Sequence, residues 1–99
     1  MTARQFIVHP EAIAEAKEAT VWYRQQNPNV AERFVAEYEQ VLDMINDAPD
    51  RWPPYSHATR HVKTPSFPFL IIYRATESRI VVLAVAHGHR RPGYWSKRF

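Results

Sequence analysis

Residues 80–95 read IVVLAVAHGHRRPGYW, and this stretch decides how the rest of the chain is interpreted. Its first seven residues form an unbroken, largely β-branched apolar run, which is typical of a central strand buried on both faces. Glycine and proline then appear as turn signals, and polar and aromatic side chains follow within a few residues. A rigid strand that ends in such residues favours a functional site at one edge of the fold. The candidates that this stretch contributes are His87, His89, Arg90, Arg91, Tyr94 and Trp95.

The remaining chain predicts one α+β domain over residues 1–99 with the order β-α-α-β-β-β. A short strand is expected at residues 5–8, followed by helices that run from Pro10 to about Gln26 and from Pro28 to about Asp47. The Asn27-Pro28 turn between them is so short that the helices must form an antiparallel hairpin. Three strands should follow as an antiparallel meander, with the hairpin covering one face of an antiparallel sheet. They are expected at residues 59–63, at residues 69–74 and from Arg79 onward.

Two helical stripes are expected to face the core. On the first helix Ile13, Ala16, Thr20 and Tyr23 recur at three- and four-residue intervals, with Trp22 beside them. The second helix carries a stronger stripe, which should pack on Ile72, Val82 and other sheet residues and consists of Phe34, Tyr38, Val41 and Ile45. Residues 48–58 are proline-rich and are expected to be an irregular loop, held to the body by its aromatic residues.

Charge is distributed unevenly along the sequence. Residues 1–58 contain five Lys/Arg and nine Asp/Glu, a net charge of −4, whereas residues 59–99 contain eight Lys/Arg and one acid, a net charge of +7. The basic part indicates a surface for a polyanion or an acidic partner, with two differently solvated faces as the alternative. There is no cysteine, no apolar run that could span a bilayer and no signal-peptide core. We therefore expect a cytoplasmic protein without membrane contact.

Several motifs together resemble the RelE/ParE superfamily of type II toxins, and the ParE-like, plasmid-stabilisation branch in particular. They are the helical hairpin, the pattern R-x-V-x-x-x-x-F-P-F-L-I-I-Y from Arg60, and A-V-A-H-x-x-R-x-P-G-Y-W from Ala84. The resemblance implies a small toxin that a cognate antitoxin neutralises in a hetero-oligomer by wrapping a C-terminal segment around it. RelE-type members cut messenger RNA on the ribosome, whereas ParE-type members poison DNA gyrase. A third alternative is a non-toxic interaction or nucleic-acid-binding module.

Ribonuclease chemistry would need a proton acceptor, cations for the developing charge and a proton donor. Weak catalytic candidates are His87, His89, Arg60 and Tyr94, each of which also has a structural interpretation. The chain has only three lysines, whereas RelE-type nucleases use many basic residues, so the sequence favours the ParE-like alternative.

A contact role is the other interpretation of the basic residues. The predicted target-binding residues are Arg90, Arg91, Tyr94 and Trp95, although the two aromatic residues are also suited to packing. The predicted antitoxin-binding residues are Arg74, Arg90 and Arg91, at the rim of an apolar contact. No cofactor is expected. A zinc site from His87 and His89 with His57 or His61 is a minor alternative, because no carboxylate motif completes it.

Overall fold

A computed structural model describes residues 4–98. The first strand and the two helices are β1 (Gln5–Val8), α1 (Pro10–Gln26) and α2 (Pro28–Asp47). The strands that follow are β2 (Pro54–Tyr55), β3 (Thr59–Lys63), β4 (Phe69–Ala75) and β5 (Arg79–His87). The predicted α+β order is confirmed. The proline-rich segment, which was expected to be irregular, contains β2 and a short 3-10 helix, Ser56–Ala58.

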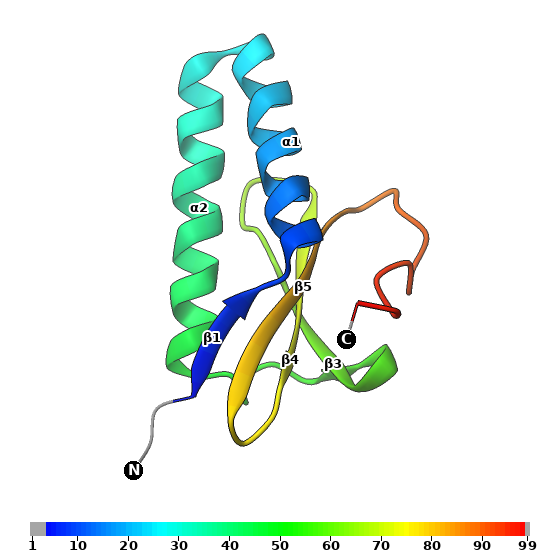
Figure 1. Cartoon of the computed structure of the whole chain (residues 1–99). Coiled ribbons are helices and arrows are strands. Elements are labelled where there is room, and N and C mark those ends of the chain that lie inside the picture. The colour runs from blue at the N-terminus through cyan, green and yellow to red at the C-terminus, as the bar shows by residue number, and fades with distance from the viewer. Residues whose placement is uncertain (1–3, 99) are drawn as a thin grey trace.

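The five strands form one mixed sheet in the order β1-β5-β4-β3-β2, with the helical hairpin packed on one face (Figure 1). The meander of β3, β4 and β5 is antiparallel as predicted, and β2 extends it. β1 pairs in parallel with β5, so the sheet is not purely antiparallel. Strands joined by a short hairpin must be antiparallel. β1 is instead connected to the meander through two helices, and this long connection allows it to pair in parallel.

Side chains that the sequence placed at helix boundaries form the helix caps. The Nδ1 atom of His9 accepts a hydrogen bond of 3.1 Å from the Glu11 N–H at the start of α1. Asn27 ends α1 by donating its N–H to the Tyr23 carbonyl and begins α2 by accepting the Asn29 N–H. This double use of one residue explains why the turn can be so short.

The sheet separates two apolar clusters. Between helices and sheet, Phe34, Val41 and Ile45 are at most 2% exposed, and they belong to one cluster with Ile71 and Val82. The open face carries a smaller cluster, which consists of Ile72, Leu83, Ala84, Ala86 and Trp95. The expected contact of the helical stripe with Ile72 is therefore wrong, because this side chain points away from the helices.

A β-bulge in β5 explains how Val82 and Val85 both face the helices. Ile72 pairs with Ala84 and Tyr73 pairs with Val82, so Leu83 is an extra residue on β5. Strict alternation would place Val82 and Val85 on opposite faces, and the extra residue restores them to the same one.

The stripe expected on α1 is displaced from its predicted position. Its buried residues are Ala12, Ala16 and Ala19, whereas Ile13 and Trp22 are 51% and 56% exposed. The small alanines let α1 approach the sheet and α2 closely, which leaves the large side chains at the margin. No helix within residues 4–98 is long and apolar enough to cross a membrane.

Candidate functional site

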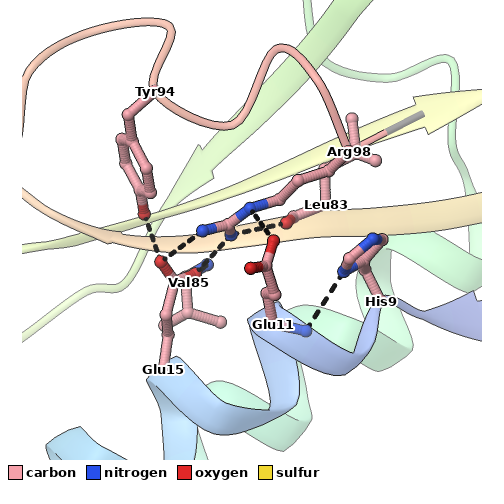
Figure 2. A network of polar contacts seen from close by, with 7 residues as sticks. All are labelled: His9, Glu11, Glu15, Leu83, Val85, Tyr94 and Arg98. Atoms are coloured by element: carbon pink, nitrogen blue, oxygen red, sulfur yellow. Dashed lines mark hydrogen bonds and ion pairs between the residues drawn. The ribbon is translucent and has the colours of Figure 1, made fainter.

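A polar network around Glu15 joins α1, β5 and the C-terminal tail, residues 88–98 (Figure 2). One carboxylate oxygen of Glu15 accepts the Val85 N–H at 3.0 Å and an Arg98 N–H at 2.9 Å. Its other oxygen accepts the Tyr94 hydroxyl at 2.7 Å and a second Arg98 N–H at 3.2 Å. Arg98 also pairs with Glu11 at 2.9 Å and donates to the Leu83 carbonyl at 3.0 Å.

This network replaces a missing strand neighbour. β1 ends at Val8, so the edge of β5 beyond that point lacks a backbone partner on its β1 side. Glu15 and Arg98 satisfy the Val85 N–H and the Leu83 carbonyl there, which would otherwise carry the cost of unpaired buried groups. The same contacts fasten the tail to the body of the fold.

Tyr94 is held as a neutral hydrogen-bond donor. Burial raises its pKa well above the usual value, and the hydrogen bond to Glu15 raises it further. The Arg90 guanidinium lies 4.0 Å from the centre of the Tyr94 ring and lowers the pKa of Tyr94, but by less than burial and Glu15 raise it. A phenol with a raised pKa is poorly suited to proton transfer near neutral pH, so this placement does not favour Tyr94 as a catalytic residue.

Trp95 packs in the interior instead of lining the surface. It is 1% exposed and belongs to the cluster on the open face of the sheet, where its ring stacks on Tyr55 with centroids 5.8 Å apart. Gly93 beside it has a φ of 83°, and a Cβ there would approach His57 to 3.2 Å. Trp95 therefore closes the open end of the sheet in this conformation, whereas Arg90 and Arg91 remain exposed.

Of the other catalytic candidates, His87 and His89 lie together, whereas Arg60 lies apart from them. Arg60 donates to the Trp52 carbonyl, and this bond anchors the proline-rich segment. His87 accepts the backbone N–H of His89, and their rings lie 5.0 Å apart. Arg60 pairs with Tyr73 and His87 with Phe69, which places them about 14 Å apart along β4 and on different strands.

The histidines do not gather around a common point. His57 lies against Trp95 and His61 against Tyr55, away from the pair formed by His87 and His89. Within residues 4–98, no group of three or more His, Cys, Asp or Glu side chains is placed to hold a metal ion.

A mostly apolar groove of about 550 Å³ runs between α1 and the adjoining ends of β4 and β5. We call it the helix-side groove. Its apolar wall is formed by Ala19, Trp22, Tyr23, Pro68, Phe69 and Val85. Its polar margin is formed by Glu15, Glu18, His87 and Arg90.

A second groove of about 360 Å³ lies on the open face of the sheet, near β1, and we call it the sheet-face groove. Arg74 and Arg79 line it at the end of the sheet opposite to His87. Sequence reasoning grouped Arg74 with Arg90 and Arg91 on one rim. The structure separates them, because Arg74 pairs with Val81 at the start of β5 whereas Arg90 follows its end.

Sequence reasoning missed Glu15, Arg98 and Trp22 as site residues. Glu11 and Glu15 stand four residues apart on one helix, a like-charge spacing that is unfavourable unless a cation joins them. That spacing indicated that a cation should lie near the two carboxylates. It could not identify the cation as Arg98, which follows Glu15 by 83 residues. Trp22 was missed because its spacing fitted the buried stripe.

Comparison with known proteins agrees with this architecture. The profile described as "ParE toxin of type II toxin-antitoxin system, parDE" matches residues 6–92. Toxin ParE2 of Mycobacterium tuberculosis, from strains CDC 1551 / Oshkosh and H37Rv, is 29% identical over 90 residues, which are 90% of this chain and 86% of the relative.

A solved structure titled "Chromosomal ParDE TA system from P. aeruginosa" superposes with a TM-score of 0.76. The match covers 86% of this chain and 96% of that chain at 15% identity, so it supports the fold. The resemblance seen in the sequence is thereby confirmed. The chain belongs to the ParE toxin family of type II toxin–antitoxin systems.

Proposed function

We propose that this ParE-family toxin arrests growth by binding and poisoning DNA gyrase, and that its antitoxin neutralises it from the helix-side groove. The dispersal of the candidate nuclease groups is the observation that carries the first part. Arg60 holds a backbone carbonyl, Tyr94 is a neutral donor to Glu15, and His87 lies on another strand. Such an arrangement favours a binding surface over a catalytic centre.

The exposed end of β5 is the surface proposed for the target. Arg90 and Arg91 are both exposed there, and arginine is among the residue types that most often dominate binding interfaces. The Glu15 network holds the tail that carries them, so the surface is largely formed before binding. Preformed surfaces lose less conformational entropy on association.

The mechanism is tested by expressing variants without antitoxin and recording growth arrest, DNA breaks and transcript cleavage. We expect Arg90→Ala with Arg91→Ala to lower toxicity far more than His87→Ala or His89→Ala. Deleting residues 90–95 would be a poorer test, because Trp95 and Tyr94 are part of the packing. A proton-transfer residue contributes about 10²–10⁴ in rate, so cleavage of ribosome-bound transcripts that one histidine change abolishes would establish the ribonuclease alternative.

The helix-side groove has the features expected for the antitoxin. Its apolar wall suits the apolar face of an amphipathic helix, and Arg90 at its margin suits an acidic one. The outer edge of β1 is the better edge for an added strand, because β2 has two residues and one of them, Pro54, has no N–H. We therefore propose that a partly disordered acidic antitoxin segment binds here as a helix, with a strand added to β1.

Trp22 and Val21 provide a matched test of this docking site. Both are exposed on α1, at 56% and 46%, but only Trp22 lines the groove. We expect Trp22→Ala to weaken binding of the cognate antitoxin by about 2 kcal/mol, roughly 30-fold. Val21→Ala should leave the affinity nearly unchanged. The site would be refuted if both variants lost the same antitoxin affinity. It would also be refuted if the wild-type toxin bound an unrelated acidic peptide as tightly as it binds the antitoxin.

A further inference from the structure

The sheet-face groove is basic on its rim and aliphatic on its floor. Arg74 and Arg79 line one side, and His9 and Thr76 add polar groups. Arg98 also reaches this groove, but Glu11 and Glu15 balance its charge. Within residues 4–98, no carboxylate side chain lines the groove, and its floor consists of Ile7, Val81 and Leu83.

The positive charge around the groove arises because most acidic residues lie on the helices and not on the sheet. Eight of the ten acids lie on α1 and α2, and the strands that carry Arg74 and Arg79 include none. The turn between β4 and β5 contains one acid, the exposed Glu77, which does not line the groove. With a sequence pI of about 9.5, the molecule presents its excess positive charge away from the helices.

We infer that the sheet-face groove binds the phosphate backbone of duplex DNA. Guanidinium groups bind phosphate oxygens in a bidentate manner, and the aliphatic floor suits the deoxyribose between phosphates. Among the residues that the structure describes, no Phe, Tyr or Trp lines this groove, and such side chains are the stacking platforms with which proteins bind single strands. An acidic protein segment is better matched to the helix-side groove, where aromatic anchors are present.

This inference rests on the proposed function and adds a second contact to it. Gyrase acts on duplex DNA, so a toxin bound to it lies near phosphate groups. Arg79 begins β5 and His87 ends it, a separation of about 27 Å for eight steps along a strand. The exposed Arg90–Arg91 end can therefore contact protein while the sheet-face groove contacts DNA.

The test is fluorescence anisotropy with a short labelled DNA duplex, measured over a series of salt concentrations. The wild-type affinity should fall with a logarithmic slope of about −2, as expected for two phosphate contacts. Arg79→Ala should reduce the magnitude of that slope by about 1, and Arg79→Lys should restore it. Arg33→Ala, which removes an exposed arginine from α2, is the matched control and should leave the slope unchanged.

Two results would overturn the inference. One is an equal slope for Arg79→Ala and Arg33→Ala. The other is a loss of antitoxin binding in Arg79→Ala without loss of DNA binding, which would assign the groove to an acidic protein segment. The proposed function is decided separately by gyrase inhibition: a chain that binds DNA through Arg79 but does not inhibit gyrase refutes the target, and leaves the groove assignment supported.

Discussion

The two grooves of this toxin differ in chemistry although the same two strands contribute to both. The helix-side groove has an aromatic and apolar wall, whereas the sheet-face groove has an aliphatic floor under arginines. They meet through one ion pair, because Glu15 lines the first and its partner Arg98 lines the second. On the assignment proposed above, two partners of different chemistry would bind on opposite sides of the sheet, and one internal network would support both surfaces.

Removing Phe34 should have the largest effect and should distinguish the two grooves. Its side chain is fully buried, and its ring lies 5.4 Å from Tyr23 and 5.2 Å from Phe69, both of which line the helix-side groove. We expect Phe34→Ala to lower the free energy of unfolding by about 3–5 kcal/mol, measured by urea denaturation. A loss below about 0.5 kcal/mol would show that the stripe is misassigned.

The same variant sharpens the comparison under conditions in which it stays folded. Antitoxin affinity should then fall more than DNA affinity, because Phe34 lies between the helices and the sheet, whereas the sheet-face groove lies on the opposite face. Equal losses at both surfaces would mean that the grooves are not independent.

Removing Glu15 should disturb both grooves at once. Glu15→Ala leaves Arg98, whose side chain is 13% exposed, with Glu11 alone, and it leaves the Val85 N–H without its acceptor. We expect a loss of about 3 kcal/mol in unfolding free energy, at the lower end for a broken buried pair. Glu11→Ala is the control, since the Glu11 side chain is 63% exposed and makes one contact with Arg98. A loss no larger than that of Glu11→Ala would refute the central role of Glu15.

Raising the pH should have the smallest effect, and the contribution of Tyr94 comes from a side chain that lines neither groove. The pKa of Tyr94 is raised in the folded state by burial and by Glu15, so its stabilising contribution is complete below the ordinary value of 10.0 and is lost as the pH rises above it. An ultraviolet titration of the phenols should show that Tyr94→Phe removes the component that ionises last. Loss of an early component instead would contradict the neutral, buried state of Tyr94.

Local signals in the sequence were sufficient for the elements but not for the contacts between distant residues. Pro10, Asn27 and Pro28 determine where the helices begin and end, so the predicted boundaries agree with the structure. The bulge at Leu83 leaves no local mark, and it reverses which residues face the helices after that point. Ile72 was assigned to the wrong face for another reason: residues 69–73 are all apolar, so their composition does not indicate which of them face the helices.

The site was predictable in part for the same reason. The exposure of Arg90 and Arg91 could be predicted from the turn signals after β5. Trp95 is of a residue type that is common in binding interfaces, but it lies in the core. The Glu15–Arg98 pair joins residues 83 positions apart, and Trp22 is exposed because the smaller alanines of α1 take the buried positions. Each of these depends on tertiary packing.

The most direct test of the central claim is to add the purified toxin to DNA gyrase and supercoiled plasmid, and to ribosomes carrying a defined transcript. We predict that cleaved plasmid accumulates with gyrase, that the cognate antitoxin prevents this cleavage, and that the transcript stays intact. The double variant Arg90→Ala, Arg91→Ala should lose the gyrase effect while retaining its fold. Cleavage of the ribosome-bound transcript with no effect on gyrase would contradict the account.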